Sequence, residues 1–160
     1  MLKAIFCVWD KISLNIPYEI VEETLLSSGQ KKAKLGLLIL DVIVVHGFFS
    51  NNHERNPHFK QLLANFLKLE EKRDFTRSCA ALCGSILFRE TDKDFEKLVC
   101  DALQSWHHKK KDDVFIDLLH DVGIRYRGVL SKFASINLSL LGSLHGGLKV
   151  MKQFVSISHF

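Results

Sequence analysis

Three ionisable side chains in the second half of the chain have types and a spacing that could support acid–base chemistry. Asp117, His120 and Asp121 are three and four residues apart, which places them on one side of a helix. A carboxylate next to an imidazole can take a proton from a substrate or give one to it. The apolar residues of the same segment define the opposite, buried side, so we expect these three side chains to lie on the solvent-exposed face. A small enzyme that uses them is the least favoured of three hypotheses.

Histidines and cysteines show no pattern typical of a metal site. The four cysteines include no CxxC pair and lie in apolar helical segments, which is typical of reduced core residues in an intracellular protein. Among the eight histidines, His46, His53 and His58 are separated by a polar loop. His107 and His108 are adjacent and would point in different directions on a helix. We therefore expect neither a metal nor a cofactor in this chain.

Basic side chains without acidic neighbours are found in the last quarter of the sequence. Residues 1–121 hold 17 basic and 18 acidic side chains, whereas residues 122–160 hold five basic ones and no acidic one. Clustered Lys and Arg can neutralise phosphates or face an acidic partner, although a solvated helix face is the commoner role. The candidate nucleic-acid or partner-facing residues are Arg125, Arg127, Lys132, Lys149 and Lys152. A second basic run, Lys109 to Lys111 beside Trp106, is offset by the two aspartates that follow and is interpreted as a solvated turn.

The segments that carry these residues are expected to be helical. A hydrophobic content of 47% with only two prolines and nine glycines leaves long uninterrupted stretches and favours an all-α fold with a real core. Apolar residues recur at three- and four-residue steps in most of the chain. The expected helices run from Pro17 to a break at Ser27–Gln30, over Leu35–Phe49, from near Pro57, over Arg73–Phe88, from Thr91–Asp94 onward, over Val114–Ile124, over Val129–Leu144 and over Leu148–Phe160.

The order of these segments predicts a helical-repeat architecture. About eight or nine helices joined by short turns, in pairs that recur every roughly 35 to 45 residues, are typical of HEAT or armadillo-like units. We therefore expect residues 1–160 to form a single α-solenoid segment, with a compact helical bundle as the structural alternative. Neither end reads as a polar capping repeat, so we expect a part of a much larger chain.

Local signals refine this prediction. Gly29 suits the left-handed position that ends a helix, and Asp113 could cap the helix that starts at Val114. The segment Leu35–Phe49 is the most apolar, but it is shorter than the about 20 residues needed to span a bilayer, and we expect a helix buried on most sides rather than a membrane segment. The predicted core includes Trp106, Phe115 and Leu118.

Motifs spread over the second half of the chain resemble a known family. They are Cys83-Gly84 with Ile86-Leu87, Asp113 with Phe115-Ile116, Phe133, and Leu144-His145-Gly146-Gly147-Leu148-Lys149. In this order and spacing, from Arg77 to near Lys152, the chain resembles the helical-repeat scaffold of the DNA-dependent protein kinase catalytic subunits, very large repair kinases of the phosphatidylinositol-3-kinase-related family.

The resemblance implies a scaffold segment of a nuclear serine/threonine kinase that acts in non-homologous end joining. In such proteins ATP and magnesium bind in a distant kinase domain, and the partners are the rest of the parent chain, the Ku heterodimer and DNA ends. This sequence has no glycine-rich phosphate loop and no metal-binding aspartate motif of a kinase, so the resemblance implies no catalytic residue within it.

Two function classes are more consistent with the sequence than an enzyme is. The leading hypothesis is a non-catalytic scaffold segment of the repair-kinase type. The alternative is a free-standing helical-repeat adaptor that binds a protein partner. An adaptor should be monomeric when it is alone in solution, whereas a scaffold fragment should expose apolar end faces and aggregate.

Overall fold

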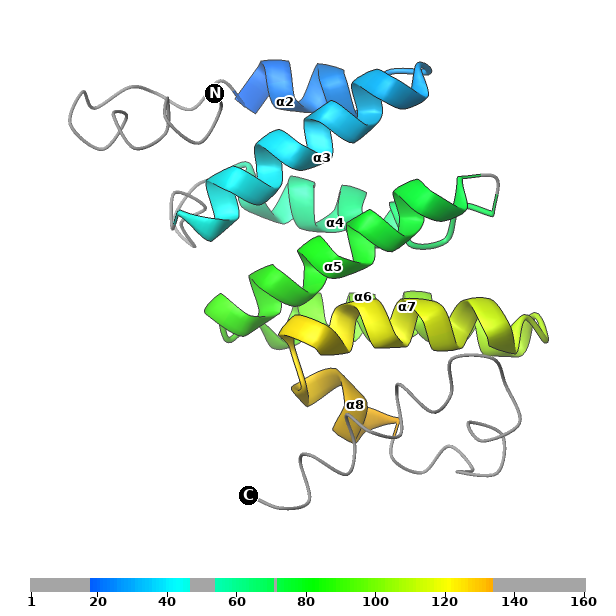
Figure 1. Ribbon diagram of the computed structural model, residues 1–160. Helices are drawn as coiled ribbons and strands as arrows, with labels where there is room; N and C mark the ends of the chain where they lie inside the picture. The colour runs from blue at the N-terminus through cyan, green and yellow to red at the C-terminus, as the bar shows by residue number, and fades with distance from the viewer. Residues whose placement is uncertain (1–17, 47–53, 71, 134–160) are drawn as a thin grey trace. The chain divides into compact units, whose positions relative to one another are not determined.

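The computed structural model describes residues 18–46, 54–70 and 72–133 of the chain. Seven helices and no strand are present in these residues, so the all-α prediction is confirmed for them (Figure 1). Eight or nine helices were expected over the whole chain, and the described part accounts for seven. The chain divides into two compact units, Met1–Phe59 and Lys60–Phe160. None of the described helices is both long and apolar enough to cross a membrane.

The first unit is built on α2 (Tyr18–Leu25) and α3 (Gln30–Val45). Helix α2 buries Tyr18, Val21 and Leu25. The two helices approach closely at Gly36, where an added Cβ would stand 2.8 Å from the backbone nitrogen of Leu25. A residue with a side chain would therefore push α3 away from the end of α2.

The prediction for Gly29 is wrong. Gly29 has φ −75° and ψ 116°, an extended conformation, and it stands immediately before α3 instead of ending α2. Its carbonyl accepts a hydrogen bond from the backbone N–H of Ala33 at 3.0 Å, so it is the residue through which the chain enters α3.

The first turn of α4 (Asn56–Phe66) belongs to the first unit and contacts α2. The rings of Tyr18 and Phe59 lie 5.6 Å apart. Beside them, Arg55 forms an ion pair with Glu19 at 2.8 Å, and His58 Nε2 lies within hydrogen-bond distance of the Glu22 carboxylate, at 2.7 Å. This helix begins close to the predicted position at Pro57.

The second unit contains the rest of α4 and four further helices. These are α5 (Arg73–Arg89), α6 (Lys93–His108), α7 (Asp112–Arg125) and the short α8 (Gly128–Lys132). Asp92 caps α6, because its carboxylate accepts a hydrogen bond from the Phe95 N–H at 2.9 Å, as the Thr91–Asp94 pattern predicted.

Two predicted boundaries in this unit are wrong. Helix α7 begins at Asp112 with Lys111 before it, so Asp113 is not its cap but lies in its first turn, where a negative charge favours the helix dipole. Helix α8 ends at Lys132 rather than at Leu144. The remainder of that predicted helix, and the one expected over Leu148–Phe160, lie outside the described residues.

The core of the second unit is aromatic and aliphatic. Trp106, Phe115 and Leu118 are 2%, 0% and 1% exposed, so the prediction that they belong to the core is confirmed. The indole N–H of Trp106 donates to the carbonyl of Leu67 at 2.8 Å, which satisfies the one polar atom of this buried side chain. The Phe115 ring meets the ring of Phe133 edge to face, with centroids 5.4 Å apart.

One lysine is buried in the same unit. The ammonium group of Lys60 lies 2.8 Å from the Glu90 carboxylate and 2.7 Å from that of Asp92. The side chains of Lys60 and Glu90 are each 8% exposed, whereas that of Asp92 is 27% exposed. Two carboxylates around one ammonium compensate its burial and tie α4 to the link between α5 and α6.

Candidate functional site

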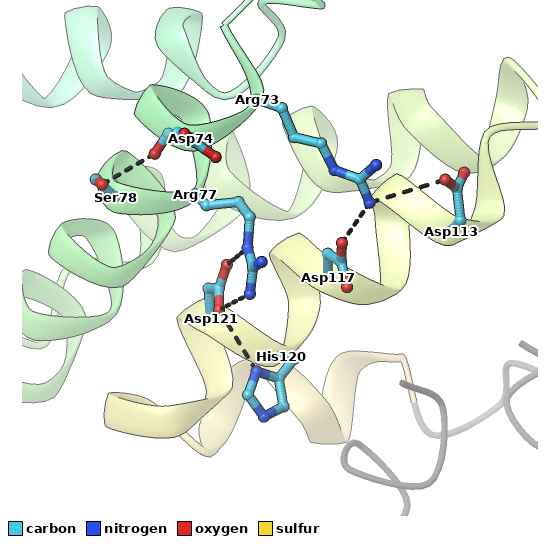
Figure 2. A network of polar contacts seen from close by, with 8 residues as sticks. All are labelled: Arg73, Asp74, Arg77, Ser78, Asp113, Asp117, His120 and Asp121. Atoms are coloured by element: carbon cyan, nitrogen blue, oxygen red, sulfur yellow. Dashed lines mark hydrogen bonds and ion pairs between the residues drawn. The ribbon is translucent and has the colours of Figure 1, made fainter. Parts of the chain in front are cut away.

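Two of the three polar residues singled out on α7, Asp117 and Asp121, form ion pairs with α5 (Figure 2). Arg73 and Arg77 are one turn apart on α5, and Asp113, Asp117 and Asp121 follow at four-residue steps on α7. The guanidinium of Arg73 donates to Asp117, and its Nη2 lies 3.8 Å from Asp113. The basic stripe of α5 thus matches the acidic stripe of α7.

Arg77 and Asp121 are joined by two hydrogen bonds. Arg77 donates through Nε to Oδ2 of Asp121 at 2.7 Å and through Nη2 to Oδ1 at 3.1 Å, a two-pronged geometry. The hydrogen bonds to Asp121 raise the pKa of the Arg77 guanidinium above its ordinary value, against the opposing effect of burial. The Nδ1 atom of His120 lies 3.4 Å from the same carboxylate.

The expectation that Asp117, His120 and Asp121 form a solvent-exposed face is wrong. Asp121 is buried, and the side chains of Asp117 and His120 are 25% and 20% exposed. Arg73 and Arg77 donate to these carboxylates and occupy the oxygens that a general base would use. The arrangement therefore holds two helices together and does not resemble an acid–base centre.

The C-terminal halves of α5 and α7 touch through their backbones. A Cβ added to Gly84 would stand 2.4 Å from the carbonyl oxygen of Val122, so only glycine permits this approach. One turn further on, the guanidinium of Arg125 donates to the hydroxyl of Ser85. The two helices run in the same direction, since the contacts 73–117, 77–121 and 85–125 advance together.

The structure places three of the five basic candidates. Arg125 ends α7 and contacts Ser85, Arg127 precedes α8 and is exposed, and Lys132 ends α8 with its Nζ 3.5 Å from Glu96 Oε1. Lys149 and Lys152 lie outside the described residues. A nucleic-acid or partner-facing role for the five residues stays a prediction.

Two lysines that the sequence analysis missed lie beside Lys132. Lys93 and Lys97 are one turn apart on α6, and with Lys132, Glu96 and Phe133 they line a surface pocket of about 380 Å³. Their four-residue spacing was visible in the sequence, but nothing there indicated that α8 would bring Lys132 to the same place. Glu96 offsets one of the three positive charges.

The basic run after α6 is paired within the second unit. Lys109 and Lys111 lie 3.1 Å and 2.6 Å from the Glu70 carboxylate, rather than being offset only by the aspartates that follow them in sequence. Both ammonium groups also approach the Trp106 ring, at 5.1 Å and 5.8 Å from its centroid. Trp106 is buried, so it is not placed to stack a nucleic-acid base.

Metal-binding and reactive-thiol chemistry find little support in the described residues. Within them, no group of three or more His, Cys, Asp or Glu side chains could hold a metal ion. Cys79 and Cys83 are buried, as predicted for core cysteines, whereas Cys100 is half-buried and Cys7 lies outside the described residues. Burial raises the pKa of the Cys79 thiol, and burial together with Glu96 raises that of Cys100 to about 11. Thiols of this kind are poor nucleophiles at neutral pH.

Comparison with known families identifies the chain. The family model described as "DNA-PKcs, CC5" matches residues 1–158. The chain belongs to the DNA-PKcs CC5 family. DNA-PKcs is a repair kinase, and this helical region is a non-kinase part of it. Neither the curated proteins nor the solved structures gave a significant match.

The motifs that carried the resemblance have structural roles in this DNA-PKcs region. Cys83-Gly84 with Ile86-Leu87 lies in α5 at the close approach to α7, and Asp113 with Phe115-Ile116 lies at the start of α7. Phe133 packs on Phe115. The fourth motif, Leu144 to Lys149, lies outside the described residues. Each placed motif therefore contributes to helix packing around α7.

Proposed function

We propose that this chain is a non-catalytic scaffold segment of a DNA-PKcs protein, with its helices arranged as part of a HEAT or armadillo-like α-solenoid. The match of residues 1–158 to the CC5 family carries the proposal. The scaffold holds surfaces of the kinase in place for DNA-end partners, including the Ku heterodimer, and works in the nucleus during non-homologous end joining. ATP and magnesium would be bound by the kinase domain of the parent protein.

The contacts between α5 and α7 support a mechanical role. A scaffold can hold its surfaces in fixed positions only if its helices do not slide along one another. Helices α5 and α7 are joined by directional contacts along their length. Arg73 and Arg77 pair with the acidic stripe of α7, and Gly84 brings the two backbones together. Such contacts favour one arrangement over neighbouring ones, because a shifted helix would leave a buried carboxylate without its arginine.

The basic side chains give this scaffold a surface for DNA or an acidic partner. Arg127 is exposed, and Lys93, Lys97 and Lys132 line one pocket on the second unit. For a direct DNA role, the double reversal Arg125→Glu with Arg127→Glu should weaken DNA binding for all sequences and reduce its salt dependence. Unchanged affinity and salt slope would leave the scaffold role without direct DNA contact.

The proposal is tested in the full-length DNA-PKcs protein that carries this region. Asp121→Arg places a second positive charge beside Arg77 in this partly buried contact and should loosen α7, whereas the exchange Arg77→Asp with Asp121→Arg restores opposite charges. We expect the single variant to lose most of the activation of the kinase by Ku and DNA ends, with phosphorylation in the absence of DNA unchanged. The charge exchange should recover part of that activation.

Limited proteolysis of the same preparations reports whether the region has loosened. A region that becomes protease-sensitive while activation by Ku and DNA ends stays at the wild-type level would refute the scaffold role.

A further inference from the structure

Helix α3 in the first unit has two apolar faces and buries only one of them. Its inner face buries residues at three- and four-residue steps, Ala33, Leu37, Leu40 and Val44. A second set with the same spacing lies on its outer side, and we call it the outer stripe: Leu35, Leu38, Val42 and Val45. Leu35, Leu38 and Val45 are 43%, 58% and 43% exposed, and Val42 is half-buried.

The spacing of the outer stripe indicates the shape of what would cover it. Its members are separated by three, four and three residues, the repeat with which one helix packs along another in a coiled coil. An extended peptide has a two-residue repeat and would not follow this stripe. The stripe extends over about 15 Å of helix, which is close to three turns of a partner helix.

The charges at the start of α3 indicate what the partner helix carries. The first turns contain Lys31, Lys32 and Lys34 and no acidic residue, although positive charge is unfavourable at the N-terminal end of a helix. Among the described residues, neither Lys31 nor Lys32 has a carboxylate within ion-pair distance, and both are exposed. Carboxylates on a helix lying along the outer stripe would pair with these lysines.

A second copy of the same chain does not fit these charges. Parallel pairing of two α3 helices would bring the two lysine clusters together. Antiparallel pairing about the middle of the outer stripe would place the lysines of each copy beside the C-terminal end of the other α3, where residues 42–45 are all apolar. Neither arrangement supplies carboxylates to Lys31 and Lys32, so the complementary partner has a different sequence.

We propose that the outer stripe of α3 is the docking site for an amphipathic helix of a partner protein, with apolar residues at three- and four-residue steps and acidic residues where it passes Lys31 and Lys32. The inference deepens the scaffold function and rests on it, since it names one surface that the scaffold presents. Its test measures binding by the chain itself and does not depend on kinase activation, so either proposal can fail alone.

The probe is a synthetic helical peptide of 18 residues with leucines in the coiled-coil repeat, made in two versions. One carries glutamates at the end that faces Lys31 and Lys32, and the other carries lysines there. By fluorescence anisotropy we expect the acidic peptide to bind the full chain at least tenfold more tightly than the basic one. In the double variant Lys31→Glu with Lys32→Glu this preference should reverse.

Two matched variants distinguish binding at the outer stripe from non-specific binding to any exposed apolar side chain. Leu38→Ser should weaken binding of the acidic peptide at least fivefold. Ile20→Ser is the control, since Ile20 is on α2 and has the same 58% exposure as Leu38. Equal loss in both variants, no loss in Leu38→Ser, or the same peptide preference after charge reversal would each overturn the proposal.

A photo-cross-linker identifies the occupant directly. With Leu38→p-benzoylphenylalanine, illumination in the presence of the acidic peptide should attach that peptide, as read by mass spectrometry of the digested product. Cross-links to another part of the same chain, or to a second copy, in place of the peptide would show that this face is already covered and would overturn the proposal.

Discussion

The substitution Gly84→Ala tests how closely α5 and α7 approach. An alanine in the middle of a helix normally stabilises it by about 1 kcal/mol relative to glycine. At this position the new Cβ would stand 2.4 Å from the carbonyl oxygen of Val122. That oxygen already accepts a hydrogen bond from the Tyr126 N–H at 2.9 Å, so it cannot turn away without breaking a contact of α7.

The two effects oppose each other, and their sizes predict the sign. Overpacking a well-packed site costs about 1 to 3 kcal/mol, and the upper part of this range, about 2 to 3 kcal/mol, applies here because the group that must move is backbone rather than the end of a flexible side chain. After subtraction of the propensity gain, we expect Gly84→Ala to lower the free energy of unfolding by about 1 to 2 kcal/mol.

Urea unfolding of the chain, followed by far-UV circular dichroism, measures this difference. The control is Ser78→Ala on the exposed side of the same helix, where the change should stay within about 0.5 kcal/mol. The two variants should share the wild-type slope with denaturant, so that a shifted midpoint reports stability. A Gly84→Ala protein that is as stable as the wild type, or more stable, would refute the close approach of the two helices.

Further predictions concern the core and two partly buried ion pairs. Phe115→Ala should cost about 3 to 5 kcal/mol in chemical denaturation, because the residue is fully buried, and a cost below about 1 kcal/mol would contradict that placement. Arg77→Ala should cost about 2 to 3 kcal/mol by leaving the Asp121 carboxylate unpaired, and adding Asp121→Ala should cost less than the sum of the two single changes in a double-mutant cycle. Burial acts to raise the pKa of Asp92, but its hydrogen bonds with Lys60 and with a backbone N–H lower that pKa, so the stabilisation is present above about pH 4 and is lost as the pH falls through the lowered value. Lys60→Met should therefore reduce the loss of unfolding free energy as the pH falls below about 4. An unchanged pH dependence would show that the Lys60–Asp92 pair contributes little to stability.

The presence of a helix could be predicted from the sequence wherever apolar residues recur regularly at three- and four-residue steps. The segment Arg73–Phe88 corresponds to α5 within one residue, and Thr91–Asp94 does open α6, because the local signals there agree with the packing. The prediction for Gly29 was wrong because the local sequence permits two structures. Glycine suits both the end of one helix and the entry to the next, and only the neighbouring hydrogen bonds decide between them.

The candidate acid–base group shows what a single helix pattern omits. The apolar side of α7 was predicted correctly, but the opposite side was assumed to face water. Asp117 and Asp121 instead meet Arg73 and Arg77 of another helix, and a polar face can be buried when its charges are matched. The reverse error occurred in α3, where an apolar run was expected to be buried on most sides and Leu38 is 58% exposed. Hydropathy indicates which side chains favour burial, but it does not show which faces of a helix the rest of the fold covers.

The packing of α5 against α7 depends on both kinds of contact that join them. Because the aspartates recur every four residues, α7 could slip by one turn and still give each arginine a carboxylate, and Arg73 already has Asp113 within 3.8 Å. The slip would, however, leave the buried Asp121 without an arginine, so the two registers differ in free energy by the cost of an unpaired buried carboxylate. Gly84 acts on the distance between the helices and not on their register, because every residue of α7 has a carbonyl that could lie opposite it. The glycine sets how closely the two helices approach, and the buried Asp121 selects the register, which is the property that a scaffold requires.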